Sequence, residues 1–143
     1  MRDQVRNARN VRNGFGRVLR RVWEMKTVLI VDDEYLIASI LSLALEDEGF
    51  LTVKATSARH ALEIIDREQP DLIITDFMMP GMTGLELAQQ VRARPFYAAT
   101  PILLMSGAQA HLAAEHPDLF EDVFDKPFEI TTIIGRIKEL LNA

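Results

Sequence analysis

The sequence predicts an open three-layer α/β sandwich, in which a parallel sheet is covered by helices on both faces. From residue 27 to residue 141, five short strand-like runs alternate with five longer segments whose apolar residues recur at helical spacing. Three of the runs are continuously apolar, which is typical of strands buried on both faces. Parallel strands joined by right-handed helical crossovers produce this architecture.

The first half of the pattern reads as two strand–helix units. Residues 27–31 (TVLIV) form a continuous β-branched run and predict a buried strand. Residues 35–48 carry an apolar helical stripe, and Gly49 is placed to end that helix. Residues 51–56 alternate as a strand does, and Ser57 is placed to cap the helix that follows.

The second half continues the alternation. Residues 71–75 predict another buried strand, and the residues from Thr83 to Glu86 form a capping box that opens a helix. The remaining elements are a strand, a short helix, a strand and a final amphipathic helix, expected at 101–106, 108–115, 122–125 and 129–141. We expect the connector 93–100 to be a loop.

Length and composition bound the kind of protein. A chain of 143 residues is about one domain, and 48% hydrophobic with 26% charged residues is ordinary for a globular protein. There is no cysteine, which excludes disulfide bonds and cysteine-ligated metals and fits a cytoplasmic protein. No apolar run approaches the ~18–20 residues of a membrane span, so we expect no span.

Charge divides the chain into two parts. Residues 1–25 hold seven arginines against two acidic residues (+5), and residues 26–143 hold nine basic against nineteen acidic residues (−10), which sum to −5. We therefore expect a basic N-terminal extension over 1–25, disordered or partly helical, and one domain over 26–143. A basic amphipathic helix is the alternative for the extension, and Met25 is an alternative start. The acidic body argues against direct DNA binding by the domain.

Polar side chains follow the expected strands, whose carboxyl ends share one edge of a parallel sheet. In open α/β sheets, ligands bind beyond this edge. The residues are Asp32, Asp33 and Glu34 after the first strand, Asp76 after the third, Ser106 after the fourth and Lys126 after the fifth. Each alone is a weak signal, because a polar residue after a strand is more often a cap or a turn. Their joint occurrence in this order predicts a site.

This set of side chains suits phosphoryl chemistry. Clustered carboxylates repel each other, and a hard divalent cation such as Mg²⁺ relieves the repulsion. A lysine and a hydroxyl add positive charge and one hydrogen bond for the oxygens of a phosphoryl group. Asp76 is then the candidate nucleophile, which would form an aspartyl phosphate.

Four motifs resemble those of the receiver domains of bacterial response regulators, over residues 26–141. They are VLIVDDE with Asp32 and Asp33, IITDFMMPGMTG with Asp76, LLMSG with Ser106, and DKPF with Lys126. The resemblance implies a flavodoxin-like, doubly wound (βα)5 fold with the strand order 2-1-3-4-5. It also implies a response regulator of a two-component or phosphorelay system rather than a dedicated enzyme.

The resemblance assigns roles in phosphoryl transfer. Asp76 would be the phosphoacceptor, and the donor would be a phosphohistidine of a sensor histidine kinase or of a histidine phosphotransfer protein. Ser106 would move toward the phosphoryl group and Lys126 would pair with it. The Lys126–Pro127 peptide bond is expected to be cis.

The resemblance also implies a Mg²⁺ site. Asp33, Asp76 and the backbone carbonyl of Met78 would bind the ion. Asp32 would act mainly through a metal-bound water. No other cofactor is implied.

Two departures from the family pattern bear on its switch. The family often carries an aromatic residue three positions before the lysine, whereas this chain has Val123 there and Phe124 next to it. The residues two positions after the phosphoacceptor and after the serine are Met78 and Ala108, neither of which can orient a water for hydrolysis. We therefore predict slow self-dephosphorylation.

Two further groups of residues are interpreted as structural. His111 and His116 are expected at the surface rather than as metal ligands. Three methionines are expected to pack around the Pro80–Gly81 turn, and they are Met78, Met79 and Met82.

Other functions fit the sequence less well. A haloacid-dehalogenase-like phosphatase needs a second aspartate where this chain has Met78. The acidic first loop would repel the phosphate of FMN, which argues against a flavin binder. A degenerate receiver, acting as a phosphorylation-independent scaffold, stays open as the alternative, although the intact site residues speak against it. The chain ends at Ala143, soon after the last expected helix, so we expect a stand-alone receiver that signals by protein contact or phosphate shuttling.

Overall fold

A parallel sheet forms the middle layer of the protein. The computed structural model describes residues 24–141. Its strands are β1 (Thr27–Val31), β2 (Leu51–Ala55), β3 (Leu72–Asp76), β4 (Ile102–Ser106) and β5 (Asp122–Asp125). They pair in the order β2-β1-β3-β4-β5, and every pair is parallel. The predicted fold class and strand order are therefore confirmed.

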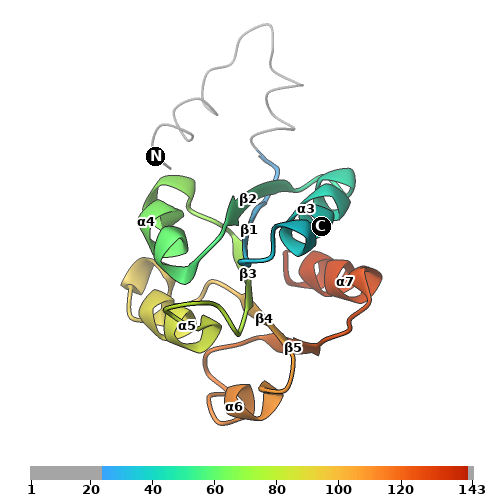
Figure 1. Cartoon of the computed structure of the whole chain (residues 1–143). Helices are drawn as coiled ribbons and strands as arrows, with labels where there is room; N and C mark the ends of the chain where they lie inside the picture. The colour runs from blue at the N-terminus through green and yellow to red at the C-terminus, as the bar shows by residue number, and fades with distance from the viewer. Residues whose placement is uncertain (1–23, 142–143) are drawn as a thin grey trace, which may run out of the picture.

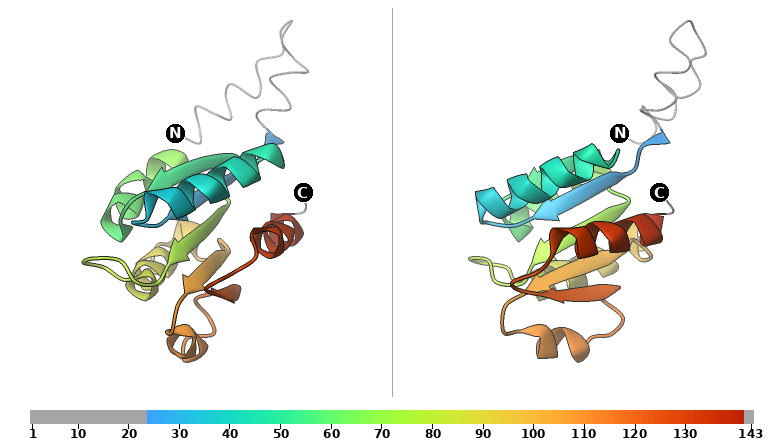
Figure 2. Two further views of the ribbon diagram at one scale, coloured as in Figure 1. Left: turned by 45° about the vertical axis from the view of Figure 1, so that its right-hand side comes forward. Right: turned by 90° about the vertical axis from the view of Figure 1, so that its right-hand side faces the viewer.

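Helices cover both faces of this sheet. They are α3 (Tyr35–Asp47), α4 (Ala58–Glu68), α5 (Gly84–Arg92), α6 (Ala110–Ala114) and α7 (Ile130–Leu141). Figure 1 shows α3 and α7 on one side of the strands and α4 and α5 on the other, with α6 beside β5. Figure 2 shows the same layers from two other directions.

The strand β3 lies at the centre and is buried along its whole length. Successive side chains point to opposite faces, so Ile73 packs in the apolar cluster under α4 and α5, and Ile74 packs in the cluster under α3 and α7. Burying each such side chain stabilises the fold by about 1.5–3 kcal/mol. Two apolar cores thus hold β3, and with it the residue at its carboxyl end, in a fixed position.

The helices begin and end at the predicted capping residues and at the predicted glycine. Ser57 accepts a hydrogen bond from the backbone N–H of His60 at the start of α4. Thr83 and Glu86 form the predicted capping box at the start of α5. Gly49 follows α3 with φ of +92°, a conformation that glycine adopts without steric cost.

The connector between α5 and β4 differs from the prediction of a loop. It contains a 3-10 turn, η1 (Pro95–Tyr97). The Tyr97 ring is fully buried, and its hydroxyl donates to the carbonyl of Ile65 and to Asp66. Arg92 donates to the carbonyls of Tyr97 and Ala98, which fixes the turn. These long-range contacts order a segment whose local sequence predicts no regular structure.

The helix α6 is shorter than the predicted 108–115. Ala113 is its one residue that is fully buried. It packs with Phe77 and Leu104 in a small third cluster of apolar residues. This helix therefore has the weakest anchorage of the helices that the structure describes.

The expectations for the N-terminal extension concern residues 1–23 almost entirely, which lie outside the described residues. In the part of the chain that the structure describes, no helix is both long enough and apolar enough to cross a membrane.

Candidate functional site

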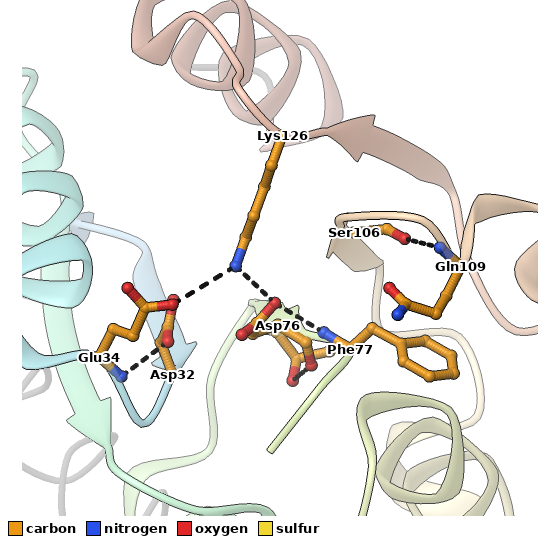
Figure 3. A network of polar contacts seen from close by, with 8 residues as sticks. Asp32, Glu34, Asp76, Phe77, Ser106, Gln109 and Lys126 are labelled. Carbon is orange, nitrogen blue, oxygen red and sulfur yellow. Dashed lines mark hydrogen bonds and ion pairs between the residues drawn. The ribbon is translucent and has the colours of Figure 1, made fainter.

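The predicted site residues meet at the carboxyl edge of the sheet. Figure 3 shows Asp32 at the end of β1, Asp76 at the end of β3 and Lys126 after β5, with the lysine ammonium lying between the acidic side chains. Ser106 ends β4, one position beyond Met105, the residue that pairs with Asp76. The parallel register thus brings together residues that are far apart in the chain.

Asp76 is the central carboxylate. Its side chain is buried, and its Oδ1 lies 2.9 Å from the Nζ of Lys126. The same oxygen accepts a hydrogen bond of 2.9 Å from the backbone N–H of Phe77. Both hydrogen bonds recorded for this carboxylate within residues 24–141 fall on Oδ1, so Oδ2 is the oxygen available for reaction.

Lys126 faces several carboxylates at once. Burial lowers its pKa, but the hydrogen bond and the charge of Asp76 outweigh burial, and Asp32 and Glu34 add to them, so the pKa is raised. The Oε1 of Glu34 lies 3.9 Å from the lysine Nζ. The lysine is therefore held in its charged form at the site. The Lys126–Pro127 bond is cis, as predicted.

The surroundings of Asp32 disfavour its ionised form. Its side chain is fully buried; Oδ1 accepts from the backbone N–H of Glu34 at 2.8 Å, whereas Oδ2 has no hydrogen-bond partner among residues 24–141. Burial, and secondly the charge of Asp76, raise the pKa of Asp32 to about 6. A buried carboxylate with one unpaired oxygen is costly unless a further group binds it.

A hard cation fits these carboxylates. Asp32, Asp33 and Asp76 each offer an oxygen, and the three oxygens lie within 4.8 Å of one another. Mg²⁺ prefers such oxygen ligands, and the unpaired Oδ2 of Asp32 is a ready acceptor for it or for its water. The donor set therefore agrees with the predicted metal.

Ser106 is near the site but is turned away from Asp76 (Figure 3). It is fully buried, and its Oγ accepts from the backbone N–H of Gln109 at 3.1 Å. A hydroxyl that accepts this bond keeps its own proton for another partner. A rotation of the side chain is needed before that proton can reach a group on Asp76.

Val123 and Phe124, which follow each other in β5, point to opposite faces of the sheet. Val123 packs with the third cluster, next to α6, whereas Phe124 packs in the cluster under α3 and α7. The ring of Phe124 therefore lies on the face away from α6 and cannot replace an aromatic residue at position 123.

The methionines after Asp76 do not share one environment. Met79 is buried and Met82 packs against the same core, as expected. Met78 is different, because 58% of it is exposed. The expectation that all three pack around the turn is wrong for Met78, whose side chain lies on the surface beside the site.

Gly84 is a residue that the sequence interpretation missed. Its N–H donates to the carbonyl of Phe77 at 2.8 Å, and a Cβ at this position would overlap the carbonyl oxygen of Asp76. Only glycine lets the start of α5 approach the phosphoacceptor candidate this closely. The signal in the sequence was a glycine directly after the capping residue Thr83.

Comparison with known proteins gives one family. The family model described as the response regulator receiver domain matches residues 28–138. The regulatory protein VanR of Enterococcus faecium is 35% identical over 116 residues, which are 80% of this chain and 49% of VanR. The phosphate regulon transcriptional regulatory protein PhoB of Pseudomonas aeruginosa is 32% identical over 118 residues, covering 81% of this chain and 52% of PhoB. The chain thus spans about half the length of these relatives.

Other relatives match over nearly their whole length. Sporulation initiation phosphotransferase F of Bacillus subtilis is 32% identical over 115 residues, which are 80% of this chain and 92% of that protein. The chemotaxis response regulator CheY4 of Vibrio cholerae has a TM-score of 0.73 at 30% identity, covering 81% of this chain and 98% of CheY4. The receiver domain of the Francisella response regulator 1452 has a TM-score of 0.74 at 28% identity, covering 82% and 97%.

Substitution of Gly84 by alanine should destabilise the fold. The added Cβ displaces either the start of α5 or the backbone of Asp76, and we expect a loss of at least about 2 kcal/mol in the free energy of unfolding, measured with urea. Gly135→Ala is the matched control, because a Cβ there meets nothing within 4 Å inside helix α7, and it should stabilise by up to about 1 kcal/mol. Equal effects of the two substitutions would contradict the prediction.

Asp32→Asn should stabilise the protein when divalent cations are removed by a chelator. The pKa of Asp32 rises from 3.8 to about 6 on folding, so its ionised form opposes folding above that pH and has no such effect below about pH 4. A pKa shift of this size corresponds to a loss of about 3 kcal/mol in the free energy of unfolding when Asp32 is ionised. We expect a gain approaching that value at neutral pH, because asparagine keeps the bond to Glu34, and little gain at about pH 4. Urea unfolding at both pH values measures it; a gain that does not depend on pH would contradict it.

Proposed function

Because the chain belongs to the family of response regulator receiver domains, we propose that Asp76 accepts a phosphoryl group and thereby acts as a switch in a two-component phosphorelay. The observation that carries this proposal is the buried Asp76, whose Oδ1 is held by Lys126 and by the N–H of Phe77. The similar solved structures at 28% and 30% identity are a response regulator receiver domain and a chemotaxis response regulator, which supports the same function.

The transfer step uses one oxygen of Asp76. Oδ2 attacks phosphorus, the bond between phosphorus and the donor nitrogen of a phosphohistidine breaks, and the electron pair of that bond stays on the imidazole. Lys126 neutralises negative charge on the phosphoryl oxygens, since its ammonium already lies 2.9 Å from Oδ1. The Ser106 hydroxyl donates to a phosphoryl oxygen after it rotates away from Gln109.

We assign a Mg²⁺ site to Asp33, Asp76 and the backbone carbonyl of Met78, with Asp32 acting mainly through a metal-bound water. The close carboxylate oxygens and the unpaired Oδ2 of Asp32 support this assignment. Bound Mg²⁺ would supply positive charge that lowers repulsion between the carboxylates and the incoming phosphoryl group.

The partner that supplies the phosphoryl group is proposed to be a histidine kinase or a histidine phosphotransfer protein. Helix α3 begins at Tyr35, directly after the acidic loop, and carries exposed apolar side chains at successive turns of one face. They are Leu36, Ile40 and Leu43. An exposed apolar stripe next to a site marks a protein contact surface. A protein donor that reaches Asp76 therefore has this face available for docking.

A scaffold that works without phosphorylation is the less favoured alternative. A scaffold has no need for a buried carboxylate with a raised pKa such as Asp32, which opposes stability at neutral pH. We keep slow self-dephosphorylation as part of the proposal, because Met78 is exposed and apolar and Ala108 has no polar side-chain atom.

Incubation with acetyl phosphate and Mg²⁺ tests the phosphoacceptor. We expect the wild-type chain to gain the mass of one phosphoryl group, detected by intact mass spectrometry, and Asp76→Asn to gain none. Omission of Mg²⁺ should prevent the gain, because the carboxylates then repel the donor. The proposal fails if the wild-type chain stays unmodified, or if Asp76→Asn is modified equally.

If protein donors dock on the exposed face of α3, a substitution there should slow phosphoryl transfer from a protein but not from acetyl phosphate. Ile40→Ser should slow phosphotransfer from a phosphorylated kinase or phosphotransfer protein about tenfold, the size of a moderate interface contact, and leave acetyl phosphate labelling unchanged. Phe96→Ser is the control, because Phe96 is similarly exposed but precedes β4, at the opposite edge of the sheet. Equal slowing by both substitutions, or slowing of labelling by acetyl phosphate, would rule out docking on α3.

A further inference from the structure

Gln109 carries an unused hydrogen-bond acceptor beside the phosphorylation site. Its Oε1 is buried and has no hydrogen-bond partner among residues 24–141. Figure 3 shows the carboxamide between Ser106 and Phe77, on the side of Asp76 where Ser106 lies. The side chain is folded back over the chain, since a Cβ at Gly107 would lie 3.7 Å from this oxygen. An unpaired buried acceptor is rare in a protein and calls for a partner of complementary chemistry.

The backbone keeps Gln109 in this place. Its N–H donates to the buried Oγ of Ser106, and its carbonyl accepts from the N–H of Leu112 in the first turn of α6. Gln109 is the residue before α6, and its side chain makes no capping hydrogen bond there. The bond to Leu112 does not involve Ser106, so it still holds the backbone of Gln109 at the start of α6 after the Ser106 hydroxyl turns to the phosphoryl group. The side chain makes no capping bond and is free for another partner.

We propose that the Gln109 carboxamide orients the water that hydrolyses the acyl phosphate on Asp76. Its Oε1 accepts a hydrogen bond from the attacking water. A carboxamide that positions an attacking water is an established means of phosphoryl hydrolysis. The inference rests on the proposed function, because it assumes that Asp76 is phosphorylated.

The step balances without a further reactant. The water oxygen forms a bond to phosphorus as the bond between phosphorus and the Asp76 oxygen breaks. The electron pair returns to the Asp76 carboxylate, and the water proton leaves with inorganic phosphate. Gln109 only orients the water, since an amide does not take up a proton at neutral pH.

This role fits the other residues around the phosphoacceptor. Met78 and Ala108 supply no polar side-chain atom, so they cannot hold the water. Ser106 and Lys126 are committed to the phosphoryl oxygens in the proposed function. Asp32 also has an unpaired oxygen, but the proposed function assigns it to the metal-bound water, so among the described residues drawn at the site Gln109 is the one with an acceptor left for the attacking water. Hydrolysis that is slow overall would then depend on this one residue.

The experiment measures hydrolysis and phosphorylation separately on the full chain. The wild type, Gln109→Leu and Gln109→Glu are labelled with acetyl phosphate and Mg²⁺, the donor is removed, and loss of the phosphoryl group is followed by intact mass. We expect Gln109→Leu to slow hydrolysis about tenfold without changing the rate of labelling, and Gln109→Glu, which keeps an acceptor, to stay within about threefold of the wild type. Gln90→Leu is the control, because Gln90 is exposed on α5, and it should change neither rate.

Each outcome decides the question. Hydrolysis by Gln109→Leu at the wild-type rate overturns the inference but leaves the proposed function standing. If Gln109→Leu slows labelling as well, or does not fold, Gln109→Ala takes its place, because alanine also removes the acceptor. Hydrolysis by Gln109→Ala about tenfold slower than that of the wild type then supports the inference, and hydrolysis at the wild-type rate overturns it. A wild-type chain that takes up no phosphoryl group overturns the proposed function and, with it, the inference.

Discussion

The ion pair between Lys126 and Asp76 is the interaction on which the site depends. Two buried aspartates, Asp32 and Asp76, lie close together at the carboxyl edge of the sheet, with Glu34 also in reach of the same lysine. One ammonium cannot neutralise this charge, and burial together with the charge of Asp76 raises the pKa of Asp32. The cluster therefore opposes folding and is ready to bind positive charge. A phosphoryl site with a divalent cation needs this arrangement.

The apolar cores of the fold offset the destabilising effect of the buried charges at the site. Two apolar cores on opposite faces of the sheet enclose β3 on both sides, so its last residue cannot relax away from the lysine. Gly84 allows α5 to start against the backbone of Asp76, which closes the remaining side. Among the helices of residues 24–141, α6 buries the fewest residues, and it lies next to Ser106 and Gln109. The rigid part of the fold thus positions the reactive carboxylate, while the least anchored helix adjoins the groups that must move.

The sequence predicted the fold well because its signals were local and periodic. Continuous apolar runs, the capping residue Ser57, the capping box at Thr83 and Gly49 each act over a few residues, and the structure confirms them. The turn at Pro95–Tyr97 was missed, because it depends on contacts with α4 that no local pattern records. In the site, residue types at strand ends could be predicted. The exposure of Met78, the direction of Ser106 and the unpaired oxygen of Gln109 could not, since each depends on side-chain packing in three dimensions.

Because position 123 is a valine, an aromatic side chain there cannot connect a change at Asp76 with the surface of the protein. An aromatic ring there would be able to move in response to Ser106, but Val123 is small and packs beside α6, and Phe124 is held in the core on the opposite face. Two physical connections from Asp76 toward α6 remain. One is the hydrogen bond from Gln109 to Ser106, which would break if the hydroxyl turns to a phosphoryl group as proposed. The other is Phe77, whose N–H binds Asp76 while its ring packs against Ala113 of α6. Both contacts involve the start and the buried face of one short helix, so under the proposed function we expect α6 to change when Asp76 is phosphorylated.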